Sequence, residues 1–127
     1  MKISRLQGEL FLRTIYKLND KSFNIQTQYK ILKLKKSISE EVAWAKENIL
    51  FKLMDEYCEK DENGNIAISE DGRTYKIDKD KVDEFAKKMD EYDKIEIQLP
   101  DIYFSEDELA DLGLTLEELE IFMEFIK

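Results

Sequence analysis

The sequence predicts an α+β fold with an N-terminal helical hairpin that contains one long helix, a small antiparallel β-sheet and short C-terminal helices. Apolar residues recur every three or four positions through most of the first half of the chain, which is typical of amphipathic helices. Apolar and polar residues then alternate in two short stretches, as they do in half-buried strands. Two helix-capping sequences near the C-terminus complete the pattern.

The first helix is predicted from Ser4 to about Leu18, with Ser4 placed to cap its first turn. Gly8 lies inside this helix, where glycine costs about 1 kcal/mol relative to alanine. We interpret Gly8 as a position of close packing against another segment, with a fraying helix start as the alternative.

The second helix is predicted from about Ile25 to Tyr57, because helical spacing continues there without Pro or Gly. Ser37–Ser39 is the point at which it could break. Some thirty residues would span roughly 45 Å at 1.5 Å per residue, which is longer than a compact domain of this size requires. We therefore expect this helix to fold back on the first, so that residues 1–58 form a helical hairpin.

Residues 59–127 are predicted to form an acidic α+β half. Lys60–Asn65 has the composition of a turn, and the alternation that follows, as far as Ile77, predicts a β-hairpin. A third helix is expected to begin at Asp78 or Asp80 and to dock on this hairpin. Its apolar face would consist of Val82, Phe85, Ala86, Met89 and Tyr92.

The strand predicted at Ile95–Leu99 ends at Pro100 and could lie beside the hairpin as its third strand. Two capping boxes follow, and they predict two short helices separated by Gly113. The boxes are formed by Ser105 with Glu108 and by Thr115 with Glu118. No repeat or Pro-, Gly- or Ser-rich linker interrupts the chain, so residues 1–127 are expected to be a single domain.

The net charge of −9 is unevenly distributed along the chain. Residues 1–54 carry 11 Lys/Arg and 5 Asp/Glu, whereas residues 55–127 carry 9 Lys/Arg and 24 Asp/Glu. An acidic surface repels phosphate backbones and attracts basic protein surfaces, so a protein partner is expected rather than direct nucleic-acid binding. The basic half could also neutralise the acidic half within the fold.

Targeting and catalytic signals are not apparent in the sequence. No apolar run approaches the roughly 20 residues of a membrane helix, and the N-terminus lacks a signal-peptide pattern, so we expect a cytoplasmic protein that does not bind membranes. The chain has no histidine, and the acidic neighbours of its single cysteine, Cys58, disfavour a reactive thiolate. No catalytic, cofactor-binding or metal-binding residue is predicted.

A calcium loop is the metal site that the sequence most nearly resembles. Asp61, Asn63 and Asn65 alternate as the first ligands of an EF-hand do. Ile66 replaces the required glycine and Gly72 the bidentate glutamate, so we interpret the segment as a surface turn.

The basic stretch of the second helix, which contains Lys30, Lys33, Lys35 and Lys36, could contact phosphates, with Tyr29 adding stacking. We prefer a solvated helix face that pairs with the acidic half, because the patch is small.

Candidate partner-binding residues are Trp44 and part of the C-terminal segment. Trp44 could anchor an interface, although core packing is the preferred interpretation. The C-terminal segment carries more apolar side chains than one face of a short helix can bury, so it forms either a docking site rimmed by acids or a helix that closes the core. The candidates there are Asp111, Glu117, Glu118, Glu120, Phe122, Glu124 and Phe125.

Four segments follow one another along the chain: the N-terminal MKISRLQGELFLRTIYKL, the turn KDENGN, the strand IEIQLP and the ending LGLTLEELEIFMEFI. Their order resembles that of a family of small phage-encoded proteins of unknown function, and the similarity covers the whole chain. In the ending, Leu114 and Thr115 precede Leu119 and Phe122 in a pattern that recurs in that family. The resemblance implies a phage or prophage origin and an accessory role in the cytoplasm of a bacterial host.

These observations together predict a non-enzymatic accessory protein that binds another protein, in its narrowest form an acidic inhibitor of a host defence nuclease. Its acidic half would then occupy the basic channel in which the nuclease holds nucleic acid. One alternative is a phage assembly factor or homo-oligomeric scaffold joined through the long helix. Another is an enzyme that uses carboxylates with a divalent metal, although no ligand spacing supports it.

Overall fold

The computed structural model describes residues 1–19 and 21–126. Their contacts form two compact units. Unit 1 comprises Met1–Val42 and Ile95–Lys127, and unit 2 comprises Ala43–Lys94. The contacts therefore do not separate at residue 58, where the sequence suggested a boundary between two halves.

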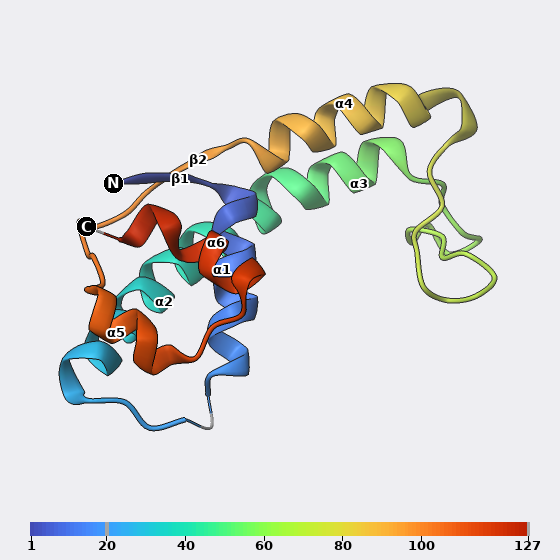
Figure 1. Cartoon of the computed structure of the whole chain (residues 1–127). Coiled ribbons are helices and arrows are strands. Elements are labelled where there is room, and N and C mark those ends of the chain that lie inside the picture. The colour runs from blue at the N-terminus through green and yellow to red at the C-terminus, as the bar shows by residue number, and fades with distance from the viewer. Residues whose placement is uncertain (20, 127) are drawn as a thin grey trace. The chain divides into compact units, whose positions relative to one another are not determined.

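The predicted α+β class is confirmed, with helices as the main component and one small antiparallel sheet (Figure 1). In chain order the elements are β1 (Lys2–Ser4), α1 (Arg5–Lys17), α2 (Ile25–Ala45), the π-helical turn η1 (Lys46–Leu50), α3 (Phe51–Tyr57), the 3-10 turn η2 (Lys79–Lys81), α4 (Val82–Asp93), β2 (Glu96–Gln98), α5 (Glu106–Leu112), α6 (Leu116–Phe122) and the 3-10 turn η3 (Met123–Phe125). The helical run continues through Ser37–Ser39, so the break suggested there is wrong, and the irregularity lies at η1. No helix among the described residues is both long and apolar enough to cross a membrane.

The sheet of unit 1 joins the N-terminal strand to a strand that lies far along the chain, after α4. β1 pairs antiparallel with β2, and Ile3 lies opposite Ile97 with both side chains buried. The predicted strand at 95–99 is thus confirmed in its core, but its assignment beside the 66–77 hairpin is wrong. The three-residue partner Lys2–Ser4 is too short to show a strand period in the sequence, which is why the pairing was missed.

Gly8 lies where α2 and the sheet approach α1 closely. A Cβ atom on Gly8 would lie 3.1 Å from Ile38 Cγ2 and 3.3 Å from Ile97 Cδ1, so the predicted close packing is confirmed. Ser4 caps α1, because its side chain accepts a hydrogen bond from the Gln7 backbone N–H.

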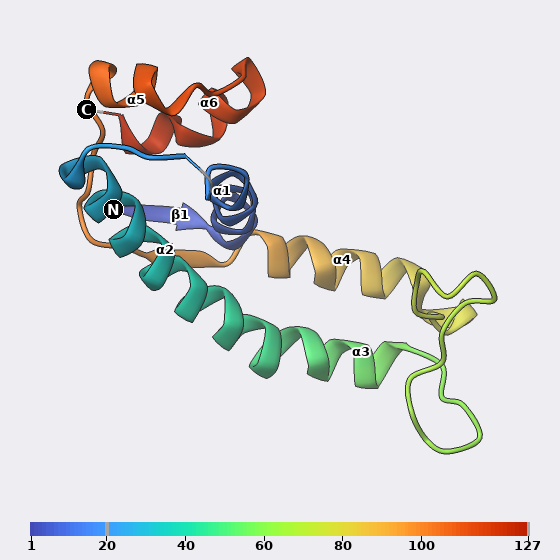
Figure 2. The same ribbon diagram turned by 90° about the horizontal axis from the view of Figure 1, so that it is seen from below.

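The first two helices cross instead of forming the antiparallel hairpin that was expected. Figure 2 views α1 along its axis while α2 runs across the picture, and α1 lies between α2 on one side and α6 on the other. A hairpin requires a matched apolar face along both helices. Here α1 also contacts α6, through Phe11 and Phe122, so part of its apolar surface is not available to α2.

The core of unit 1 is built around four phenylalanines from different segments. The ring centroid of Phe11 lies 4.7 Å from that of Phe122 and 4.7 Å from that of Phe125, and Phe104 lies 5.7 Å from Phe122. All four side chains are fully or almost fully buried. The C-terminal segment therefore supplies half of the aromatic centre of the unit that also contains the N-terminal helix.

Unit 2 packs the end of the long helical run against α4. Tyr57 is buried, its hydroxyl donates to the Glu84 carboxylate at 2.8 Å, and its ring lies 5.8 Å from that of Phe85. The predicted apolar face of α4 is correct for Phe85, Met89 and Tyr92 but wrong for Val82 and Ala86, which are exposed. The helix also starts later than expected.

The start of α4 and the segment before it depart from the prediction. Asp78 precedes η2 and makes no side-chain capping bond, so neither predicted aspartate opens the α-helix. The predicted hairpin is reduced to isolated antiparallel bridges, Cys58 with Ile77, Lys60 with Ile66 and Ile68 with Tyr75. Ile68 and Tyr75 are exposed, so no buried face holds a regular ladder together.

Candidate binding surface on the C-terminal helices

The two C-terminal helices begin at the predicted capping boxes. The Ser105 hydroxyl accepts from the Glu108 N–H at 3.2 Å, and the Glu108 carboxylate accepts from the Ser105 N–H at 3.0 Å. Thr115 and Glu118 repeat this geometry at 3.2 and 3.0 Å. Each box satisfies backbone donors that a helix start would otherwise leave unpaired.

Gly113 separates the helices, as predicted, because it ends α5 in the left-handed region with φ of 64°. Glycine reaches this conformation without the steric cost that a Cβ atom imposes. The last carbonyl of α5, that of Leu112, accepts from Lys21 Nζ at 3.3 Å. The turn between α5 and α6 is thus fixed to the segment that precedes α2.

The inner side of the C-terminal segment closes the core. Phe122 and Phe125 are buried in the aromatic centre of unit 1, so their assignment to a partner-binding surface is corrected. For these two residues, the interpretation as a helix that closes the core is correct, and the interpretation as a docking site is wrong. Their apolar rings face α1, where Phe11 provides a large complementary surface.

The outer side of α6 and the turn after it remains exposed. We define the acidic face as Leu116, Glu117, Glu120, Met123 and Glu124, which recur at helical spacing and are all exposed. Leu116 is 86% exposed and Met123 57%, so the excess of apolar side chains noted in the sequence does reach the surface. None of the described residues forms an ion pair with the three glutamates of this face.

One acid of this region, Glu118, is instead used within the fold. Glu118 caps α6 and lies 3.8 Å from Lys17 Nζ, and the backbone hydrogen bond from Thr115 lowers the pKa of its carboxyl. Glu118 therefore belongs to the internal contacts more than to a free surface. Asp111 is exposed on α5.

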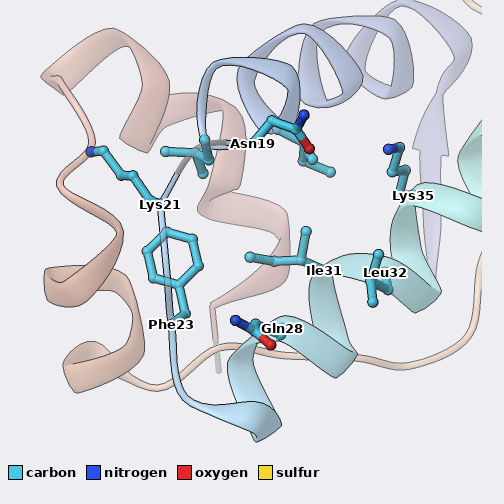
Figure 3. Close-up of a pocket in the computed structure, with 9 residues that line it drawn as sticks. Asn19, Lys21, Phe23, Gln28, Ile31, Leu32 and Lys35 are labelled. Carbon is cyan, nitrogen blue, oxygen red and sulfur yellow. The ribbon is translucent and has the colours of Figure 1, made fainter.

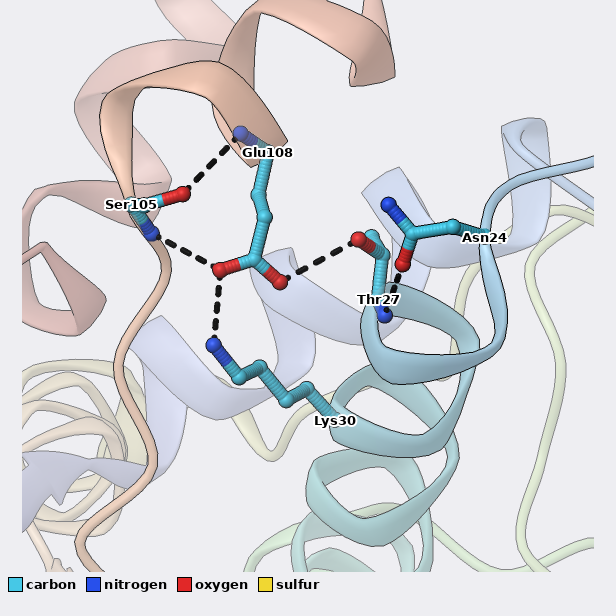
Figure 4. A network of polar contacts seen from close by, with 5 residues as sticks. All are labelled: Asn24, Thr27, Lys30, Ser105 and Glu108. Carbon is cyan, nitrogen blue, oxygen red and sulfur yellow. Dashed lines mark hydrogen bonds and ion pairs between the residues drawn. The ribbon is translucent and has the colours of Figure 1, made fainter.

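Glu108 is the centre of a polar network between α5 and α2 (Figure 4). Its carboxylate accepts from Lys30 Nζ at 2.7 Å and from the Thr27 hydroxyl at 3.1 Å, in addition to Ser105. Burial acts to raise the pKa of this carboxyl, but the hydrogen bonds from Lys30, Ser105 and Thr27 outweigh it and lower the pKa to about 2. Asn24 completes the site by accepting from the Thr27 N–H at 2.8 Å.

The basic and acidic parts of the chain meet inside unit 1. Residues 1–42 carry nine Lys/Arg and four Asp/Glu, and residues 95–127 carry one and ten, so the unit has a net charge of −4. Lys30 pairs with Glu108, Lys17 with Glu118 and Lys2 with Glu96, so acids and bases neutralise one another within the fold. Of the basic stretch, Lys30 is the residue that takes part in this pairing. The acidic face is what this pairing leaves exposed.

A pocket lies between the end of α1, the segment that follows α1, and the first turns of α2 (Figure 3). It has a volume of about 180 Å³. Its apolar wall is formed by Ile15, Leu18, Phe23, Ile31 and Leu32, and its polar rim by Asn19, Lys21, Gln28 and Lys35. Sequence reasoning missed this pocket, because the periodicity of each helix gives no information on where two helices diverge.

Trp44 lies in unit 2 and is 58% exposed, so its preferred interpretation as a core residue is wrong. The helix buries Ala45 next to it, and Trp44 falls outside that buried side. Its role as an interface anchor stays a prediction.

The other chemical candidates behave as structural groups. The Asp61 carboxylate accepts from the N–H groups of Asn63 and Asn65 at 2.9 and 3.0 Å, which confirms a turn. Cys58 is buried at the end of α3, and burial is the main cause that raises the pKa of its thiol. Among the described residues, no group of three or more His, Cys, Asp or Glu is arranged to hold a metal ion.

In comparisons with known proteins, no family model, curated protein or solved structure matches this chain.

Proposed function

We propose that this chain is a non-enzymatic, phage-type accessory protein of the bacterial cytoplasm that binds a basic surface of another protein through its acidic face. The observation that carries the proposal is the pairing pattern of the C-terminal acids. Glu108 and Glu118 are held by internal partners, whereas Glu117, Glu120 and Glu124 stay exposed around Leu116 and Met123. A partner would gain both a charge complement and apolar contact area there.

The narrower form of the proposal is inhibition of a host defence nuclease. A nuclease channel for nucleic acid is lined by Lys and Arg, and carboxylates on a rigid helix can occupy it in place of phosphates. Glu117 and Glu120 lie on α6 and Glu124 lies in η3, and both elements are anchored because Phe122 and Phe125 are buried in the core. Close ionic contacts of this kind weaken as salt screens them, over a Debye length of about 10 Å at 0.1 M.

The inhibitor form is tested with the charge-reversed variant Glu117→Lys/Glu120→Lys/Glu124→Lys. We expect the unmodified protein to slow cleavage of labelled duplex DNA by nucleases in a bacterial lysate. The variant should lose this inhibition, and so should the unmodified protein at high salt, because both remove the attraction. Circular dichroism verifies that the variant is folded.

The matched control is Glu47→Lys/Glu62→Lys/Glu70→Lys, which changes the net charge equally but alters exposed residues of unit 2. It should inhibit as the unmodified protein does. Equal loss in both variants would show that total charge, and not the acidic face, is responsible. If the unmodified protein does not slow cleavage, the inhibitor form is wrong.

A second candidate function, an assembly or scaffold protein that associates with itself, is favoured by the exposed apolar side chains at the start of α2. Ile25, Tyr29 and Leu32 are spaced along one side of that helix and are all exposed. Lys33 lies over the Tyr29 ring at 5.1 Å, so this side is basic as well as apolar.

A further inference from the structure

We propose that the pocket beside α2 accepts Leu116 from a second copy of this chain, with Glu117 of that copy placed against Lys35 at the pocket rim. The inference rests on the proposed binding role of the acidic face and names a partner for it. The juxtaposition that supports it is an open apolar pocket with a basic rim and, on a different helix of the same unit, a projecting apolar side chain beside acids.

The pocket has the dimensions and lining of a site for one aliphatic side chain. Apolar cavities of about 150 Å³ hold molecules of the size of benzene, and this pocket measures about 180 Å³. Ile15, Leu18 and Ile31 form buried walls, whereas Leu32 is 60% exposed at the mouth. A leucine that entered would cover Leu32 as well as lose its own contact with water.

Leu116 is the side chain of unit 1 best placed to enter such a pocket. It is the first residue of α6, and its 86% exposure exceeds that of the other large apolar side chains of the described chain. The capping box of Thr115 and Glu118 fixes the backbone on either side of it. Binding would therefore immobilise one side chain on an ordered helix, which keeps the entropic cost of docking low.

Charge complementarity orients the insertion. Lys35 lies at the pocket rim, and Lys33 and Lys36 are exposed on the same helix. Glu117 follows Leu116 directly, and Glu120 lies one turn further along α6. The same lysines would repel another basic surface, so the pocket selects an apolar residue with acidic neighbours.

The contact joins two different surfaces, because pocket and leucine occupy separate helices. Its area is smaller than a standard stable interface, which buries about 1,600 Å². We therefore expect weak, salt-sensitive association that leaves the acidic face free at low protein concentration and covers it where the protein is concentrated.

The experiment is sedimentation velocity over a concentration series at low salt. The unmodified protein should associate, and Leu116→Glu and Lys35→Glu should each weaken association by about ten- to a hundredfold. An equimolar mixture of the two variants should recover association, because one variant retains the pocket and the other retains Leu116. Ile68→Glu and Lys52→Glu, both at exposed positions of unit 2, are the matched controls and should associate normally.

A monomer at every concentration would overturn the proposal, and so would a mixture that fails to associate. Self-association that survives Leu116→Glu would also overturn it, since the contact would lie elsewhere. Lys35→Glu distinguishes failure of this proposal from failure of the proposed function, because the substitution leaves the acidic face intact. That variant should lose self-association yet still bind a basic partner protein, whereas failure of the proposed function would abolish partner binding in the unmodified protein.

Discussion

Phe122→Ala should lower the free energy of unfolding by about 3–5 kcal/mol. The Phe122 ring contacts Phe11, Phe104 and Phe125, and its side chain is fully buried. Truncation removes the apolar surface and leaves a cavity that three surrounding rings cannot fill without moving. Urea-induced unfolding followed by circular dichroism measures the loss.

Met123→Ala is the matched control for this substitution. Met123 is the next residue but is mostly exposed, so its truncation should change the free energy of unfolding by less than about 0.5 kcal/mol. A loss below about 1 kcal/mol for Phe122→Ala would contradict the assignment of Phe122 to the core. It would also restore Phe122 as a candidate for contact with a partner.

Glu108→Gln should make the protein less stable at neutral pH and remove part of its sensitivity to acid. The pKa of Glu108 is about 2 in the folded protein, against an ordinary value of 4.5. The unfolded chain therefore binds the proton more readily, so the contribution of Glu108 is present above pH 4.5 and is lost as the pH falls through about 2. This difference corresponds to at most about 3 kcal/mol at neutral pH, and solvent screening of the carboxylate reduces that contribution.

The measurement is the difference in unfolding free energy between the unmodified protein and Glu108→Gln from pH 7 to pH 2. The difference should shrink toward zero across the interval between pH 4.5 and 2. Glu106→Gln, at an exposed position in the same helical turn, should cause little change at any pH. A difference for Glu108→Gln that does not vary with pH would contradict the network with Lys30 and Thr27.

Local signals in the sequence predicted local structure well. The capping boxes at Ser105 and Thr115 connect residues three positions apart, so the sequence contains both partners within one helical turn. Gly8 was recognisable because glycine inside an apolar helix needs a compensating close contact. Helical spacing likewise located α1, α2, α3 and α4 in outline.

Contacts between distant parts of the chain were not predictable in the same way. β1 pairs with β2, and Lys30 pairs with Glu108, across separations that periodicity does not address. Amphipathic spacing showed that Phe122 and Phe125 were apolar positions of a short helix, but only the position of Phe11 opposite them decides that they are buried. Leu116 and Met123 are binding candidates because the structure leaves both side chains mostly exposed, Leu116 at the start of α6 and Met123 in η3.

Contacts between distant parts of the chain also change which acids are available to a partner. Sequence alone gave residues 55–127 a large excess of acid, which suggested a broadly acidic surface. In the structure, Lys30 forms an ion pair with Glu108 and Lys17 with Glu118. Fewer acids are therefore available to a partner, and those of the acidic face lie around the exposed side chains of Leu116 and Met123. This favours a defined docking contact over general electrostatic attraction.

Affinity capture tests the central claim most directly. The tagged protein is incubated with a bacterial lysate at moderate salt, in parallel with Glu117→Lys/Glu120→Lys/Glu124→Lys and with the unit 2 control Glu47→Lys/Glu62→Lys/Glu70→Lys. We predict that the unmodified protein and the control retain the same basic protein in stoichiometric amount and that the acidic-face variant does not. Equal recovery of that protein by all three, or recovery of no protein by any of them, would contradict a binding role for the acidic face.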